Sequence, residues 1–157
     1  MKRKKIYITI LIIIIIILLL SYVGINYIDN INATPTDIFY NNEEKFESVV
    51  DELSGDSIIE IEEKFTFFKI THDYKNEKKI YKNSDTYIKY ENSINLIKEL
   101  NLEFILKNHK NIQFTLNSNM RTSEKIVYIT DMEKYKNGHI ISEISQIKGN
   151  WYYTIEK

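Results

Sequence analysis

Hydrophobic residues follow two different patterns along this chain. Residues 6–28 form an almost unbroken apolar run, whereas apolar and polar positions alternate or recur at helical spacing after it. As a helix, the run would be roughly 34 Å long, against a hydrocarbon core of about 30 Å. It holds six consecutive isoleucines at positions 12–17, and a small soluble domain does not bury every face of one helix. We therefore predict a transmembrane helix over residues 6–28.

A cleaved secretory signal peptide is the alternative interpretation of this run, because it has the same basic start and apolar middle. Cleavage needs small residues just before the cut, yet Tyr22 and Val23 stand beside the nearest small residues of the run. Residues 31–33 (Ile-Asn-Ala) offer a second, weaker site. A lipoprotein signal is excluded because the chain has no cysteine to acylate. The sequence favours an uncleaved anchor.

Charge predicts the orientation of the anchor. Residues 1–5 carry four basic side chains, and the next Lys or Arg after the apolar run is Lys45. Loops on the cytoplasmic side carry the excess of Lys and Arg. We therefore expect a single pass through the cell membrane, with residues 1–5 as a cytoplasmic flank and the C-terminal part outside the cell. Residues 29–36 have the polarity of a short linker, and residues 37–157 are the predicted extracytoplasmic domain.

One segment of this domain has clear helical spacing. Apolar residues recur at i, i+3, i+4 and i+7 among acidic ones, which predicts an amphipathic helix. Asn41 is its predicted N-cap, with Glu44 three residues further on and Gly55 just past its end. The apolar positions are Phe46, Val49, Val50 and Leu53.

A second, shorter helix is predicted over residues 93–101, with Ser93 as its cap. We interpret residues 86–90 before it as a strand or an irregular approach. Residues 74–84 are polar and rich in lysine without a clean period, so they are predicted to be a loop or a weak hairpin.

The remaining apolar positions alternate, which predicts strands. The segment from Ile112 to Asn117 has polar residues at every second position, so we expect one face of it to be solvated. Residues 126–129 are apolar on both faces and predict a central strand, followed by a polar loop that ends at Gly138. We predict an α+β fold in which two helices pack on a mostly antiparallel, meandering sheet. The predicted strands lie near residues 59–63, 65–70, 102–106, 112–117, 126–129, 140–147 and 151–155.

Composition limits the functions to consider. Four of the 21 basic residues precede the apolar run, which leaves 17 basic against 22 acidic residues and a net charge of −5 after it. Nucleic acid is therefore excluded as the main partner. The abundance of Ile, Lys, Asn and Tyr is typical of an AT-rich genome, so tyrosine-rich and asparagine-rich patches do not by themselves indicate a binding site.

Three segments carry a resemblance to known proteins: residues 46–53 (FESVVDEL), 112–114 (IQF) and 149–153 (GNWYY). With them the sequence resembles small uncharacterised membrane-tethered exported proteins of low-GC Gram-positive bacteria. That resemblance implies an origin in a Gram-positive bacterium and attachment to the membrane by a lipid or a single helix. Its motifs are packing and turn signatures, so it implies no catalytic residue.

The sequence contains no glycine-rich phosphate loop, no HExxH motif, no GxSxG motif and no cysteine nucleophile. Its three histidines, His72, His109 and His139, are predicted in loops or at strand ends, and their spacing does not indicate a shared metal. Glu60 and Glu62 would face one side of a strand and Glu63 the other. Such a pair can bind calcium or act as acid and base, but we interpret it as the wet face of an edge strand.

We therefore predict no catalytic, cofactor-binding or metal-binding residue and no cofactor. The leading hypothesis is a membrane-anchored binding or interaction domain that meets the bilayer through residues 6–28 and a protein or peptide partner outside the cell. An exposed Tyr152 would contribute to such a surface. The alternatives are an immunity or protective factor against a toxin or bacteriocin and an envelope enzyme. The enzyme would use a pocket that includes His72 or His139.

Overall fold

The computed structural model describes residues 33–82 and 84–157. The predicted basic flank, the transmembrane helix at 6–28 and residues 29–32 of the linker lie outside the described residues. The chain divides into two units between Thr34 and Pro35, and Pro35–Lys157 forms the folded domain. Within the described residues, no helix is both long and apolar enough to cross a membrane.

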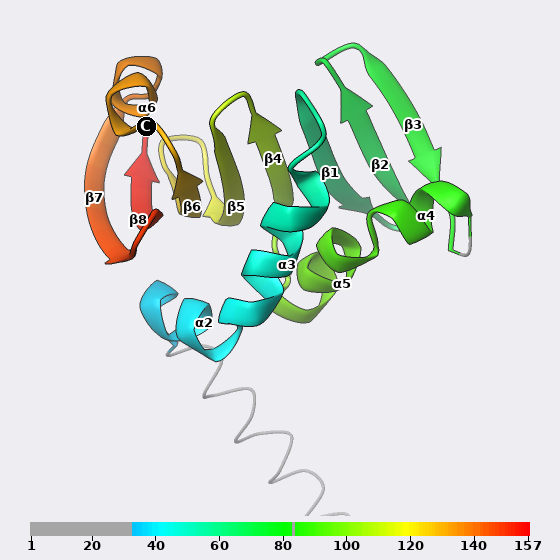
Figure 1. The fold of residues 1–157 in the computed structure, drawn as a ribbon, viewed down its shortest axis with the longest axis horizontal. Coiled ribbons are helices and arrows are strands. Elements are labelled where there is room, and N and C mark those ends of the chain that lie inside the picture. The colour runs from blue at the N-terminus through cyan, green and yellow to red at the C-terminus, as the bar shows by residue number, and fades with distance from the viewer. Residues whose placement is uncertain (1–32, 83) are drawn as a thin grey trace, which may run out of the picture. The chain divides into compact units, whose positions relative to one another are not determined.

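One eight-stranded sheet forms the centre of the domain, in the order β3-β2-β1-β4-β5-β6-β8-β7 (Figure 1). Every neighbouring pair is antiparallel, so the predicted α+β class with a mostly antiparallel sheet is confirmed. The edge strand β7 pairs with β8 through two register shifts. The strands are β1 (Ile59–Lys64), β2 (Phe67–His72), β3 (Asn76–Ile80), β4 (Phe104–Asn108), β5 (Asn111–Ser118), β6 (Ser123–Ile129), β7 (Ile141–Lys148) and β8 (Trp151–Glu156).

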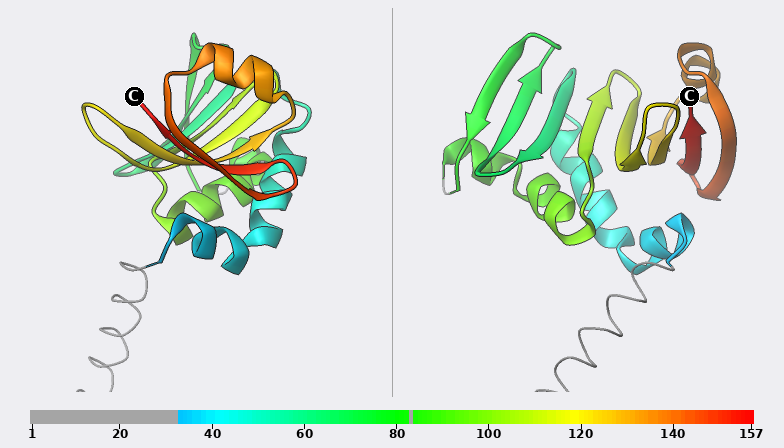
Figure 2. Two further views of the ribbon diagram at one scale, coloured as in Figure 1. Left: turned by 90° about the vertical axis from the view of Figure 1, so that its left-hand side faces the viewer. Right: turned by 180° about the vertical axis from the view of Figure 1, so that it is seen from behind.

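The described helices cover the two faces of the sheet unequally (Figure 2). Four pack on one face, which we call the helix face, and only α6 lies on the opposite face, which we call the second face. The prediction of two helices on one face holds for α3 and α5 and misses the other three. The helices are α2 (Pro35–Asn41), α3 (Glu43–Leu53), α4 (Asp85–Lys89), α5 (Glu91–Leu100) and α6 (Met132–Gly138).

Aromatic side chains from distant parts of the chain fill the helix face below β5, β6 and β8. Ring centroids in this cluster are 4.9 to 5.7 Å apart. Each aromatic ring removes a large apolar area from water and gains further from edge-to-face contacts. Phe46 therefore lies where its helical spacing predicts, at the centre of the main core. The rings belong to Phe39, Phe46, Phe114 and Trp151.

Several predicted loops are regular structure. Residues 86–90 were predicted to be extended or irregular, but residues 86–89 belong to α4 and Tyr90 is its C-cap. Ser84 caps the start of α4 by accepting from the N–H of Tyr87 at 3.2 Å. The predicted loop at 130–138 contains α6, which Asp131 caps. Helices this short show no complete period in sequence, which is why the pattern missed them. Residues 74–84, predicted to be a loop or a weak hairpin, contain the strand β3, which forms a hairpin with the preceding strand β2.

Both predicted helix caps were wrong. Asn41 ends α2, and the amide of Asn42 donates to the carbonyl of Ile38 at 3.0 Å instead of capping α3. Ser93 is fully buried inside α5. The Glu52 carboxylate of α3 accepts from the N–H groups of Asn92 and Ser93, each at 2.9 Å, so α5 is capped by a neighbouring helix. Local sequence does not reveal such a tertiary cap.

Candidate functional site

The second face of the sheet carries buried polar side chains. Gln113 and Thr115 of β5 were predicted to face solvent, yet they are 1% and 0% exposed, so that prediction was wrong. Gln113 is covered because His139, just after α6, and Lys125 of β6 both contact it. The hydroxyl of Thr115 has no hydrogen-bond partner in the described part of the chain. Polar groups at these positions give the second face a character unlike that of the main core.

A buried ion pair lies at the centre of this face. Lys125 Nζ is 2.5 Å from Glu156 Oε2, and both side chains are about nine-tenths buried. Tyr135 of α6 donates a hydrogen bond to the other oxygen of Glu156 and lies 3.4 Å from the Thr154 hydroxyl. Burial, followed by the hydrogen bond to Glu156, raises the pKa of Tyr135. This phenol therefore stays neutral and acts as a fixed donor.

Gln113 connects the buried ion pair to Asn111 and His139 by hydrogen bonds. Lys125 can only donate, so Gln113 Oε1 is the acceptor of its 2.8 Å bond. The amide nitrogen of Gln113 must then donate to Asn111 Oδ1 and to His139 Nε2, each at 3.1 Å. His139 Nε2 is consequently unprotonated, and its Nδ1–H donates to the Tyr135 carbonyl at 2.8 Å. We call Asn111, Gln113, Lys125, Tyr135, His139, Thr154 and Glu156 the polar network.

The polar network ends at a cavity of about 390 Å³. This α6 pocket is bounded by α6, by the turn between β4 and β5, and by Tyr74 of the turn between β2 and β3. Most of its lining residues carry a polar group, although their apolar parts contribute the larger share of its surface. The lining comprises Ile58, Tyr74, Asn108, His109, Lys110, Asn111, Asp131, Lys134, Tyr135, Gly138 and His139.

Asp131 orders one wall of the α6 pocket. It accepts from Lys110 Nζ at 2.8 Å and from the N–H of Lys134 at 3.0 Å, so it joins the β4–β5 turn to the start of α6. The hydrogen bond from Lys110, followed by that from Lys134, lowers the pKa of Asp131. Its carboxylate is therefore ionised and already neutralised by Lys110.

Tyr74 enters the pocket lining from a strained turn. Asp73 and Tyr74 have φ angles of 51° and 58°, as the two central residues of a type I′ turn do, although a bulky side chain rarely adopts such an angle. The turn is closed by the N–H of Lys75, which donates to the carbonyl of His72 at 3.1 Å. Ser57 holds Asp73 through a 2.9 Å hydrogen bond. The side chain of Tyr74 remains largely exposed at the mouth of the pocket.

The structure brings two of the three histidines together. His109 and His139 both line the α6 pocket, whereas His72 lies on the helix face with its ring centroid 6.3 Å from that of Tyr90. No group of three or more His, Cys, Asp or Glu side chains that could hold a metal ion occurs within residues 33–82 and 84–157. His109 is therefore a candidate for binding a ligand through hydrogen bonds, whereas both ring nitrogens of His139 are already paired within the domain.

Two glutamates of β1, Glu60 and Glu62, are ion-pair partners. Since β1 lies between β2 and β4, the interpretation of an edge strand was wrong. Lys69 Nζ is 3.3 Å from Glu62 and 4.0 Å from Glu60. Burial opposes ionisation of Glu62, but hydrogen bonds from Lys64 and Lys69 hold its pKa below the usual value. These carboxylates are already neutralised, which does not support acid–base work.

Tyr152 is half-buried on the second face. It packs against the small apolar cluster of Val127, Ile129 and Tyr135 that holds α6 to the sheet. Its main contacts are therefore structural.

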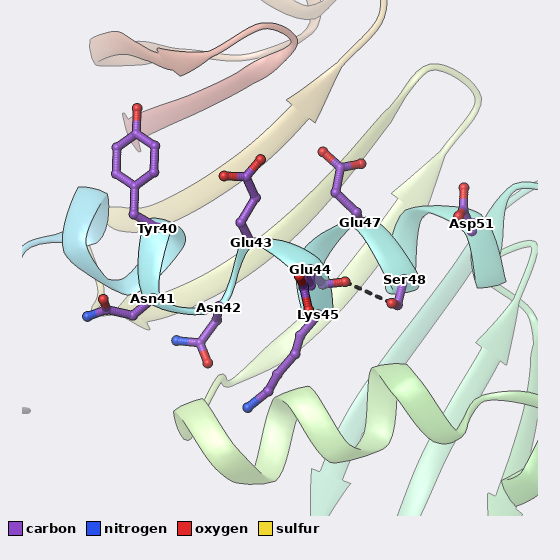
Figure 3. A pocket seen from close by; sticks show the side chains of 9 residues that line it. All are labelled: Tyr40, Asn41, Asn42, Glu43, Glu44, Lys45, Glu47, Ser48 and Asp51. Atoms are coloured by element: carbon purple, nitrogen blue, oxygen red, sulfur yellow. Dashed lines mark hydrogen bonds between the residues drawn. The ribbon is translucent and has the colours of Figure 1, made fainter.

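A larger hollow of about 730 Å³ lies over α2 and α3, but its side chains do not converge (Figure 3). Tyr40, Glu43 and Glu47 point to one side of the helices, and Lys45 points to the other. Glu43 pairs with Lys148, and Glu47 accepts from the indole N–H of Trp151 at 2.7 Å. Because these acidic groups attach α3 to the β7–β8 hairpin, we place the candidate site in the α6 pocket.

Sequence reasoning named His139 and His109 but missed the residues that organise them. One signal was available, because Lys125 shares its strand face with Val127 and Ile129 and a lysine on an apolar face needs a buried partner. The identity of that partner, Glu156, depends on β8 lying beside β6. Comparisons of the chain with family models, with curated proteins and with solved structures give no match.

Proposed function

We propose that this chain is a membrane-anchored binding module that takes a ligand in the α6 pocket on the outer side of the cell membrane. Residues 6–28 are the proposed anchor, with residues 1–5 in the cytoplasm. The apolar length of this segment and the four basic residues before it support that placement.

The observation that carries the proposal is Tyr74. A bulky residue in the left-handed region costs on the order of 1–3 kcal/mol, whereas glycine makes the same turn without strain. The chain nevertheless places an aromatic side chain there, largely exposed and lining the pocket. Strain kept at a pocket mouth supports a role in contacting a ligand.

The state of His139 favours binding over catalysis. Both ring nitrogens already have partners, Gln113 and the carbonyl of Tyr135, so neither lone pair nor proton is available for acid–base work. Lys125 is likewise held by Glu156 and Gln113. The polar network thus supports a rigid wall of fixed donors and acceptors.

Photo-crosslinking in intact cells of the source organism tests the binding site. The full chain would carry a photoreactive phenylalanine analogue at Tyr74 or, as control, at Tyr81, which is similarly exposed but does not line the α6 pocket. We expect a product at Tyr74 that is absent at Tyr81 and weakened by Lys134→Gln. Equal products at both positions would contradict a site in this pocket.

The orientation is tested separately. Protease added to intact protoplasts should digest the domain from about residue 35, where the folded unit begins. A domain that stayed protected until the membrane was opened would contradict the proposed topology.

A further inference from the structure

The polar network determines which atoms face the α6 pocket. Starting at Lys125, which only donates, each bond fixes the next: Gln113 accepts through its oxygen and donates through its nitrogen, and Asn111 accepts through Oδ1. The amide nitrogen of Asn111 is thereby the group left for the pocket. Through Gln113, the buried charge of Lys125 thus determines that Asn111 offers a hydrogen-bond donor to the pocket.

This donor has no acceptor. Asn111 is 7% exposed and lines the α6 pocket, and its Nδ2 makes no hydrogen bond to any described residue. The nitrogen is open to solvent in the pocket, since the fully buried polar side-chain atoms without a partner among the described residues belong to Asp56, Thr71 and Thr115. An acceptor brought by a ligand would satisfy it.

The pocket is positive in an acidic chain. Lys110 and Lys134 line it with one carboxylate, Asp131, which gives a formal charge of +1, against −5 for all residues after the apolar run. Asp131 pairs with Lys110, so the Lys134 ammonium is left without an ion pair among the described residues. Local positive potential of this kind attracts anions and repels cations.

We propose that the α6 pocket binds a small molecule through an oxyanion, a carboxylate or a phosphate group, that accepts from the Asn111 amide and pairs with Lys134. This inference rests on the proposed function and names the ligand class of the same pocket. Tyr74 and Ile58 provide apolar surface for the rest of the ligand. A charged acceptor suits this site because hydrogen bonds to ions are stronger than those between neutral groups.

Nuclear magnetic resonance of the full chain in uncharged detergent micelles tests the proposal. The probes are N-acetylglycine, its neutral amide, and inorganic phosphate. We expect N-acetylglycine, phosphate or both to shift the side-chain amide resonance of Asn111 with a dissociation constant of about 1 mM, and the neutral amide to leave it unchanged. The anion that binds identifies the source of the oxyanion.

Matched variants separate binding from folding. Asn111→Asp exchanges the free donor for an acceptor, and Asn95→Asp adds the same charge at an exposed position of α5. Lys134→Gln removes the pocket cation, and Lys136→Gln removes another exposed cation of the same helix that does not line the α6 pocket. In the variants the readout is the backbone amide resonance of Gly138, which lines the α6 pocket and is altered in none of them. Affinity should fall at least about tenfold in Asn111→Asp and Lys134→Gln and change less than about twofold in both controls.

Two results would overturn the inference. One is that neither anion binds, or that the neutral amide binds as well as the acid. The other is that Lys134→Gln, at an exposed position that leaves the fold intact, binds like its control. In either case the proposed function would survive if Tyr74 still captured a product specifically, and it would fall if that capture failed as well.

Discussion

The two faces of the sheet bind their helices through different interactions. On the helix face, four helices bury mainly aliphatic and aromatic side chains, and Ser93 with its contact to Glu52 is an exception. On the second face, α6 is held by a small apolar cluster and by the polar network. Replacing a buried ion pair by well-packed apolar side chains of the same volume is often neutral or stabilising. We therefore expect the charged and hydrogen-bonded groups of the second face to add less stability than the apolar core of the helix face.

The largest effect is expected on the helix face. Phe114→Ala removes a fully buried ring that contacts Phe46 and Trp151, which should lower the free energy of unfolding by about 3–5 kcal/mol. Denaturation followed by the fluorescence of Trp151, the one tryptophan, measures this. A loss below about 1 kcal/mol would show that this cluster is not the centre of the core.

On the second face, we expect that removing one partner of the Lys125–Glu156 ion pair destabilises the domain, whereas replacing both partners by apolar side chains does not. Lys125→Met leaves Glu156 buried without a counter-charge and should cost about 3 kcal/mol, whereas Lys125→Met combined with Glu156→Leu should recover most of the loss. The same denaturation experiment measures both proteins. If the double variant were as unstable as the single one, the ion pair would be a stability device and the contrast between the faces would disappear.

Glu52 tests the polar contacts of the helix face. Glu52→Ala leaves the first N–H groups of α5 without their acceptor, at a cost of about 1–2 kcal/mol. Burial raises the pKa of Glu52 above 4.5, although hydrogen bonds from Ser93 and Asn92 oppose this. The folded protein therefore binds this proton more tightly than the unfolded chain does.

The raised pKa of Glu52 makes the free energy of unfolding depend on pH. Relative to Glu52→Gln, the stability of the unsubstituted protein should be greatest below pH 4.5 and should fall as the pH rises through the folded-state pKa. Unfolding free energies of both proteins from about pH 4 to about pH 7 measure this difference. A difference that instead favours the unsubstituted protein increasingly with rising pH would contradict the assigned burial of Glu52.

Tyr74→Gly is expected to have the smallest effect on stability and the opposite sign. Glycine adopts positive φ without strain, so the variant should be more stable by about 1 kcal/mol. Because the variant lacks the exposed ring in the α6 pocket, it should bind the ligand of that pocket more weakly. Tyr81→Gly, at a similarly exposed aromatic, is the control for loss of the ring alone. A variant that lost stability would show that the ring is held for packing and not for a ligand.

The accuracy of the sequence predictions follows the same division between faces. Phe46, Val49 and Leu53 were placed correctly because the helix face obeys hydrophobic periodicity. The second face violates it: Gln113 lies in an alternating strand and is nevertheless buried. The environment of Gln113 depends on α6, on Lys125 and on Glu156. These groups lie near Gln113 only because β6 pairs with β5 and β8 pairs with β6. Pairing of His109 with His139 in one pocket depends on that order as well.

The two edges of the sheet bear on how the domain behaves at high concentration. An exposed strand is a template for another strand, and proteins blunt it with charge or with irregular pairing. The β3 edge presents Glu77, Lys78 and Lys79, and the β7 edge is broken by its two register shifts. Two copies of the domain therefore meet no straight, apolar strand along which they could pair into a continuous sheet. We expect edge-to-edge association of the domain to be weak even when it is concentrated.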